Sequence, residues 1–142
     1  MLILRTNLSS YGAILPIGLA YIAAALREAG HNVKVIDAPG AALDRMLGVY
    51  SPVGILNLNG LTPREIVEQM SPDTEFLGIT HMFLHEWPTI RKISELARKK
   101  NPNVIIILGG ENATAFWSSI FKETAASAAT QVTLSHDNAG ER

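Results

Sequence analysis

Apolar and polar positions alternate along the chain between strand-like and helix-like segments. Residues 104–108 read Val-Ile-Ile-Ile-Leu, with no polar position, which is typical of a central parallel strand covered by helices on both faces. Shorter apolar runs at 2–4, 33–36 and 76–80 predict three more strands. Asn32 and Lys34 interrupt the second of these, so we expect it at an edge of the sheet.

Helical segments are predicted between the strands. Residues 17–29 are almost wholly apolar, follow Pro16 and end before Gly30, which predicts a helix buried on more than one side. The sequence Thr62-Pro-Arg-Glu65 is a capping box and predicts a short helix that ends near Met70.

Two further helices follow later in the chain. Residues 86–100 carry an apolar face and end in three basic residues; the face comprises Trp87, Ile90, Ile93, Leu96 and Ala97. Asn112 is a candidate cap for a helix that runs to about Ala125. Weaker signals allow a short helix over 41–47, an extended or irregular segment over 53–58, and a fifth strand over 132–134.

This order of elements predicts an α/β fold. We expect a flavodoxin-like (Rossmann-like), doubly wound parallel sheet in three αβα layers, with strand order 2-1-3-4(-5), where the fifth strand depends on the weak signal at 132–134. The length of 142 residues suits one domain. We place that domain at residues 1–125, followed by a poorly defined tail over 126–142.

Composition excludes several classes of function. The net charge of −1, with mixed signs, argues against a nucleic-acid partner. The sequence has no cysteine, so these residues cannot supply a disulfide, a thiolate metal site or the ligands of an iron–sulfur cluster. The longest apolar run, 14–26, contains Pro16 and is too short to span a bilayer, and the first residues lack signal-peptide features. We therefore expect a cytoplasmic, soluble domain with no membrane partner.

Candidate ligand contacts follow the strands at the carboxyl edge of the predicted sheet, where open α/β sheets bind ligands. The first loop contains neither G-x-G-x-x-G nor a P-loop, which weakens the case for a dinucleotide or NTP site. Its hydroxyls and glycine fit either a binding loop or an ordinary polar turn. The candidate residues here are Asn7, Ser9, Ser10, Gly12 and Leu15.

The other two loops also leave alternatives open. The second contains Thr80, His81, Met82 and Phe83, and its H-x-x-x-H-E spacing is not the zinc motif H-E-x-x-H, so we expect no metal bound by protein side chains. The third, Gly109-Gly110-Glu111-Asn112, suits either a plain strand-to-helix turn or a contact with a polar ligand. No spacing indicates a catalytic triad or carboxylate pair, so the residues alone indicate a binding site and no reaction.

Three segments together resemble a known family. Residues 16–37 read PIGLAYIAAALREAGHNVKVID, residues 78–83 read GITHMF and residues 107–115 read ILGGENATA. They are similar to the motifs of the amino-terminal cobalamin (B12)-binding domain of B12-dependent radical S-adenosylmethionine (SAM) enzymes. The first motif, P-x-G-L-x-Y-L-A-A-x-L-R-E-x-G-H-x-V-x-V-x-D, is fairly specific, and the resemblance covers residues 2–115.

The resemblance implies a cobalamin site at the three loops. The wider B12-binding fold carries D-x-H-x-x-G, whose histidine binds cobalt, but here the corresponding residues are Asn7-Leu-Ser9-Ser-Tyr-Gly12. Serine is a poor cobalt ligand, so the implied state is base-off without a histidine ligand. The S-x-L motif falls at Thr80-His-Met82 and the G-G motif at Gly109-Gly110. Small residues there would admit the nucleotide tail, and the corrin ring would lie near Leu15, Met82 and Phe83.

The resemblance also implies a catalytic partner. The radical SAM half of such enzymes binds a [4Fe–4S] cluster through three cysteines, which this sequence lacks. We therefore expect an isolated or truncated cobalamin-binding module of a methyltransferase-like or cyclase-like enzyme, not catalytic by itself, with the radical SAM domain absent. The alternatives are a non-enzymatic α/β receiver or partner-binding module, which lacks an Asp where Thr80 ends its strand, and a flavin- or nucleotide-binding flavodoxin-like domain.

Overall fold

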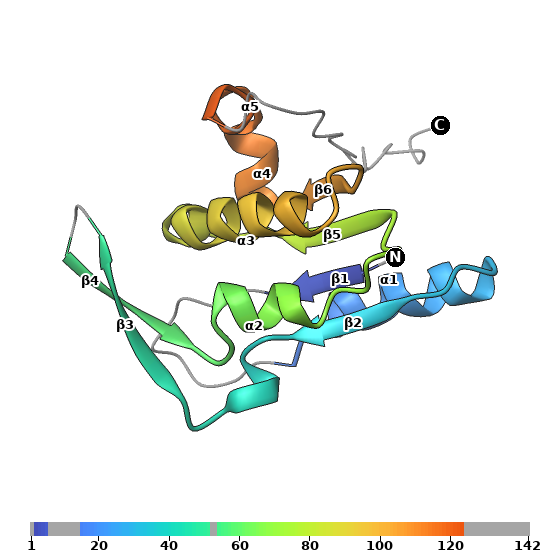
Figure 1. Cartoon of the computed structure of the whole chain (residues 1–142), viewed down its shortest axis with the longest axis horizontal. Helices are drawn as coiled ribbons and strands as arrows, with labels where there is room; N and C mark the ends of the chain where they lie inside the picture. Colours follow the sequence, from blue (N-terminus) through green and yellow to red (C-terminus); the bar gives the residue numbers. More distant parts are fainter. Residues whose placement is uncertain (1, 6–14, 52–53, 124–142) are drawn as a thin grey trace, which may run out of the picture.

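Four parallel strands form the central sheet of the computed structural model, which describes residues 2–5, 15–51 and 54–123 (Figure 1). Their spatial order is β2-β1-β5-β6, with β2 at one edge. The strands are β1 (Leu2–Arg5), β2 (Lys34–Asp37), β5 (Phe76–Thr80) and β6 (Ile105–Gly109). The prediction of a mixed α/β fold built on a parallel sheet is confirmed.

Side chains of β5 and β6 alternate between the two faces of the sheet. Leu77 and Ile79 on β5, like Ile106 and Leu108 on β6, are buried in the main core. Residues between them point to the opposite face because successive side chains of a strand alternate. The paired positions on that second face are Gly78 with Ile107 and Thr80 with Gly109.

Helices α2 (Pro63–Glu68) and α3 (Trp87–Lys100) pack together and cover the first face of the sheet (Figure 1). The inner side of α3 contributes Ile90, Ile93 and Ala97, all 0% exposed. At about 1.5–3 kcal/mol for each large aliphatic side chain, this burial is the main contribution to holding α3 on the sheet. The predicted apolar face of residues 86–100 is confirmed.

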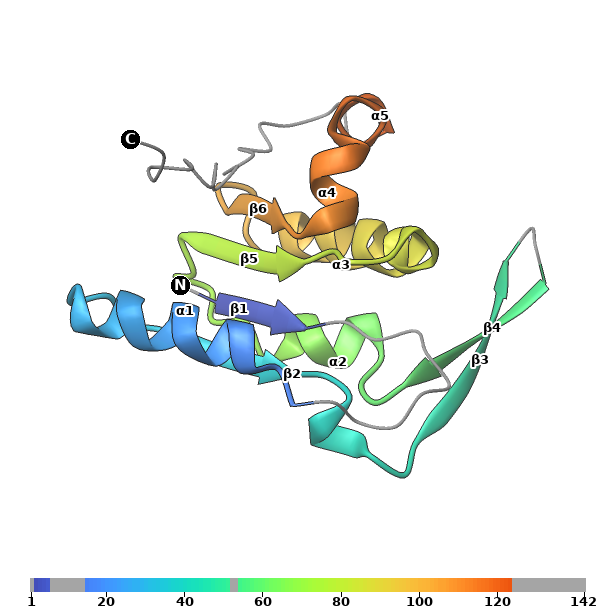
Figure 2. The ribbon, with the colours of Figure 1, turned by 180° about the vertical axis from the view of Figure 1, so that it is seen from behind.

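Helix α1 (Ile17–Glu28) packs on the second face, against β1 and β2 (Figure 2). The expectation that it is buried on more than one side is wrong for the described residues. Ala23 is buried against Val33, whereas Ile17 and Tyr21 are 61% and 75% exposed. A single helix covering a small sheet has neighbours on one side, so its other apolar side stays open to solvent.

The capping box before α2 forms as predicted. The Glu65 backbone N–H donates to Thr62 Oγ1 at 3.3 Å, and Glu65 Oε2 accepts from the Thr62 N–H at 2.8 Å. Arg45 donates to the same carboxylate at 2.8 Å. Hydrogen bonds from Arg45 and then from Thr62 lower the pKa of Glu65 to about 2. The start of α2 is thereby tied to the segment before the hairpin described next.

Residues 41–51 depart from the prediction, whereas residues 54–58 are extended, which is one of the two alternatives given for 53–58. The expected helix over 41–47 is wrong: a 3-10 turn, η1 (Gly40–Ala42), is followed by strand β3 (Met46–Ser51). β3 pairs antiparallel with β4 (Gly54–Asn59) in a hairpin outside the main sheet, extending away from it in Figure 1. The Leu61 N–H donates to the Ala38 carbonyl, and Gly60, at φ +101°, leaves no room for a Cβ beside that carbonyl. This close backbone approach closes the hairpin stem, and no periodicity in the sequence marks it.

The predicted helix from Asn112 to Ala125 is also corrected. It is divided into α4 (Glu111–Ala115) and α5 (Trp117–Glu123) at Phe116, and the residue before α4 is Gly110. Asn112 does not cap the helix because it is the second residue of α4, and its side chain is buried against His81. The proposed fifth strand at 132–134 and the tail after 125 lie outside the described residues. In the part of the chain that the structure describes, no helix is long and apolar enough to cross a bilayer.

Candidate functional site

The site is built where β5 and β6 end side by side. Thr80 and Gly109 are register partners at the carboxyl ends of these strands, one step beyond Gly78 and Ile107. All four belong to the face of the sheet opposite α3. Figure 2 shows α1 over β1 and β2 but no helix over this part of β5. Among the described elements, the sheet therefore presents an uncovered strip near its carboxyl edge, where Gly78, Thr80 and Gly109 accompany Ile107.

The two consecutive glycines have different surroundings. A Cβ on Gly109 would meet no atom within 4 Å, so this backbone faces open space. Gly110 has φ +116°, and a Cβ there would lie 2.7 Å from the His81 carbonyl oxygen and 2.9 Å from Met82 Sδ. Gly110 is therefore required by the turn itself, as only glycine adopts this conformation easily. The turn leaves Gly109 free to admit a ligand.

His81 continues the inward alternation of Leu77 and Ile79, and its residue exposure is 0%. Its backbone N–H donates to the Gly109 carbonyl at 2.6 Å. Its ring Nε2 lies 2.7 Å from Asn112 Nδ2, and the ring stacks on Trp87 with centroids 5.7 Å apart. Burial lowers the pKa of His81 from its ordinary value of 6.5, and a hydrogen bond to the Phe83 backbone opposes part of that shift. An amide N–H can donate to Nε2 only while that nitrogen lacks a proton, so the ring is neutral in this arrangement.

Glu86 fixes the loop that follows β5. Its carboxylate is buried and accepts from the backbone N–H groups of Met82 and Phe83, each at 3.2 Å. Burial of these polar oxygens is tolerated here because backbone donors pair with them. The side chains of Met82 and Phe83 remain outside, 44% and 56% exposed. The backbone of this loop is thus held by Glu86, while its apolar side chains are exposed.

The predicted site residues fall into three groups. Thr80, Met82, Phe83 and Gly109 come together at the carboxyl edge, and Leu15 and Glu111 are exposed at the ends of neighbouring loops. His81 and Asn112 were expected to contact a ligand, but both are buried and pair with each other, so they support the loops from inside. The first-loop candidates lie outside the described residues; they are Asn7, Ser9, Ser10 and Gly12.

Sequence reasoning missed the role of Glu86, whereas the turn at Gly110, itself a predicted site residue, is one of the two alternatives considered for Gly109-Gly110. The signal for His81 was available, because Leu77, Ile79 and His81 occupy alternate positions and therefore one face. No comparable signal exists for Glu86, whose partners are backbone groups of its own loop.

The arrangement suits binding better than acid–base chemistry. Among the described residues, no group of three His, Cys, Asp or Glu side chains lies close enough together to hold a metal ion. The buried histidine is neutral and its ring contacts are internal. What remains at the surface is backbone, a hydroxyl and apolar side chains, which fit a large, partly apolar ligand.

Comparison with known proteins agrees with this geometry. The family described as "B12 binding domain" matches residues 6–139. The chain therefore belongs to the B12-binding domain family, and cobalamin is the ligand that this membership implies. A curated relative, cytidylyl-2-hydroxyethylphosphonate methyltransferase from Streptomyces wedmorensis, is 30% identical over 104 residues. The aligned region is 71% of this chain but 19% of that relative, so the chain spans about a fifth of its length. No solved structure matches significantly.

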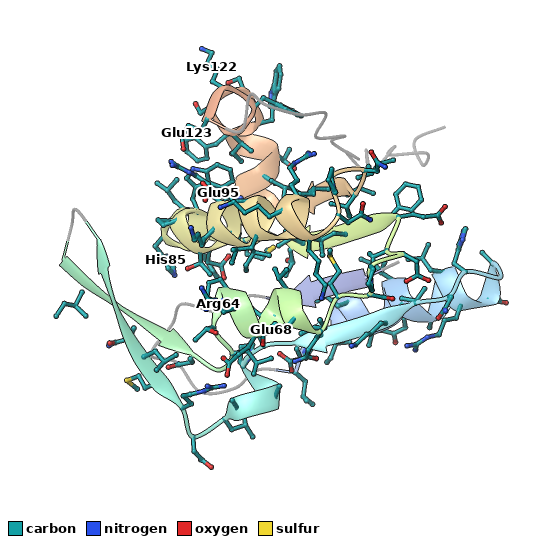
Figure 3. All side chains as sticks on the ribbon, viewed as in Figure 1. Arg64, Glu68, His85, Glu95, Lys122 and Glu123 are labelled. Carbon is teal, nitrogen blue, oxygen red and sulfur yellow. The ribbon has the colours of Figure 1, made fainter. Side chains whose placement is uncertain are left out.

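The described residues fit a corrinoid. The open space beside Gly109 would accommodate part of the cofactor without rearranging the turn, and the Thr80 hydroxyl lies on the neighbouring strand. Met82 and Phe83 offer apolar contacts for the ring. Of the two histidines in this loop, His81 is enclosed. His85, which is labelled in Figure 3, is exposed and stacks against Phe83.

Proposed function

We propose that this chain is the cobalamin-binding module of a B12-dependent radical SAM enzyme of methyltransferase or cyclase type. The observation that carries the proposal is the open backbone at Gly109 beside Thr80, on a strip of sheet that no described helix covers. The nucleotide tail would extend along this strip, and the corrin ring would rest near Met82, Phe83 and Leu15. When bound, cobalamin supplies the organometallic chemistry, while the protein binds and orients it.

We further propose that cobalamin binds base-off with no histidine on cobalt. Serine occupies position 9, where the D-x-H-x-x-G pattern would place the ligand histidine. His81 is fully buried and bonded to Asn112, so its ring nitrogens are turned away from the surface. A spectrum of the loaded protein reports this state directly.

The [4Fe–4S] cluster and SAM would belong to a catalytic domain or partner chain, because these 142 residues contain no cysteine. The small share of the methyltransferase relative that aligns here, 19%, supports a larger catalytic assembly. We propose the exposed side of α1 as its contact surface. It carries the large apolar side chains Ile17, Tyr21 and Ile22, and Leu15 is exposed just before the helix. We place the module at residues 1–125 and treat 126–142 as the segment beyond it.

The decisive test is reconstitution with hydroxocobalamin. Anaerobic incubation and desalting should leave corrinoid with the protein, and its visible spectrum should be of the base-off type. Folded but colourless protein would overturn the cofactor assignment for this chain by itself. Retention of FMN instead would favour the flavodoxin-like alternative.

A variant pair locates the cofactor. Gly109→Leu fills the open space and should abolish retention while the circular dichroism spectrum stays that of the parent, because no atom lies within 4 Å of the added Cβ. Gly18→Ala, at an exposed α1 position whose Cβ also meets nothing within 4 Å, is the matched control and should bind like the parent. Parent-like binding by Gly109→Leu would show that the tail does not lie on this strip.

A further inference from the structure

We propose that His81 and Asn112 are positioning residues, and that their buried side-chain pair holds the loop after β5 in register with the glycine turn after β6. The inference rests on the proposed function, because the site that the pair shapes is the cobalamin site. Neither residue touches the surface at which the cofactor would bind. Their effect on affinity would be exerted through Thr80, Met82 and Gly109.

The contacts of His81 join the segments that follow β5 and β6, beyond the last paired residues of these strands. Strand pairing ends at Thr80 and Gly109. One residue later, the His81 N–H donates to the Gly109 carbonyl at 2.6 Å, and its own carbonyl accepts from the Ala113 N–H at 3.4 Å. The ring then accepts from Asn112 Nδ2 at 2.7 Å. The backbone and side chain of this one residue thus contact the end of β6 and the start of α4 at three points.

The ring cannot easily turn away from Asn112. It stacks on Trp87 at an interplanar angle of 22°, and the Trp87 indole N–H donates to Glu123 on α5, the residue labelled in Figure 3. Both His81 and Asn112 are buried, with exposures of 0% and 6%. Loss of either partner would leave the other with an unsatisfied polar atom in the interior, which is unfavourable. The loops would relieve that cost by shifting.

Such a shift would change the binding surface. His81 lies between Thr80 and Met82 in the chain, and Gly110 packs so closely that its Cβ position is 2.9 Å from Met82 Sδ. Glu86 holds the amides of Met82 and Phe83, so the loop moves as a unit. Movement of His81 would therefore displace the groups proposed to meet the cofactor. A site whose loops are already ordered before binding avoids the free-energy cost of ordering them, and this preorganisation raises the affinity.

The test compares two substitutions of His81 in the whole chain. His81→Leu introduces an apolar side chain of similar size and removes the acceptor, and should weaken the Kd for hydroxocobalamin about tenfold. His81→Gln retains an acceptor oxygen for Asn112 and should stay within about threefold of the parent. Titration is followed by visible absorbance, at a temperature where circular dichroism shows that each variant is folded.

A second route uses the other member of the pair. Asn112→Ala removes the donor and should give the same weakening as His81→Leu. The double variant should be about as weak as either single one, because both break one contact and their effects are then not additive. If His81→Leu does not fold, Asn112→Ala decides the matter alone.

The outcomes are distinct. Weaker binding by His81→Leu and Asn112→Ala, with recovery in His81→Gln, supports the positioning role. Variants that unfold at lower urea but bind with the parent's Kd would show a purely structural pair and overturn the inference. A parent chain that retains no corrinoid would instead overturn the proposed function, and with it the cofactor that this pair is said to position.

Discussion

The two adjacent glycines illustrate how one residue can serve the fold while its neighbour serves ligand binding. Gly110→Ala should lower the free energy of unfolding by about 2 kcal/mol or more, because φ +116° strains any side chain and the His81 carbonyl is in the way. Gly109→Ala meets no atom within 4 Å and should change stability by less than about 1 kcal/mol. Urea unfolding of the two variants checks this split. Equal losses would mean that both glycines serve the fold.

His81 makes stability depend on pH. Burial depresses its pKa in the folded chain below 6.5, so between the folded and unfolded pKa values the unfolded state binds more protons. Its contribution to stability is therefore complete above pH 6.5 and is lost as pH falls through the lower, folded pKa. Urea midpoints from pH 8 to pH 5 should fall more in the parent than in His81→Gln. His85→Gln, at an exposed position, should follow the parent; the same curve for parent and His81→Gln would refute the assignment.

At the scale of elements, the six residues of α2 depend on their cap, since a helix this short gains little from its own hydrogen bonds. Thr62→Ala removes the acceptor for the Glu65 N–H and should lower the free energy of unfolding by about 1 kcal/mol. Glu68→Ala, at an exposed position of the same helix, should change it by less than about 0.5 kcal/mol. Urea unfolding of both variants is the measurement. An equal effect of the two would show that the cap is unimportant.

Element prediction from the sequence succeeded where one periodicity dominated. The apolar face of α3 and the capping box of α2 were predictable because both depend on residues within a few positions of each other. The hairpin of β3 and β4 was not, since it is closed by Ala38, Arg45, Gly60 and Leu61 through backbone contacts. The exposed side of α1 was misjudged because an apolar composition indicates that a helix favours burial. It does not indicate whether another segment of this chain covers that helix.

For the whole molecule, the location of the candidate site could be predicted from the sequence, but not which of its residues face outward and which support the loops. The carboxyl edge follows from parallel strands and the loops after them. Which residues face outward depends on the register of β5 against β6, and on contacts such as Asn112 with His81 that join residues 31 positions apart. Polar residues next to a site look alike in sequence, whether they contact the ligand or support the loops.

The proposed placement of the nucleotide tail makes a last prediction for the intact chain. A ligand that binds only the folded state stabilises it by about 2.7 kcal/mol at a free concentration of 100 times its Kd, which for this size raises Tm by roughly 10 °C. Hydroxocobalamin should produce this shift. Cobinamide, a corrinoid without the nucleotide tail, should need a much higher concentration for the same Tm, because the strip beside Gly109 and Thr80 would stay empty. Gly109→Leu should reduce the difference between the Tm shifts that the two ligands produce, since it blocks the tail and leaves the ring contacts at Met82 and Phe83. Equal stabilisation of the parent by both corrinoids would place the tail elsewhere.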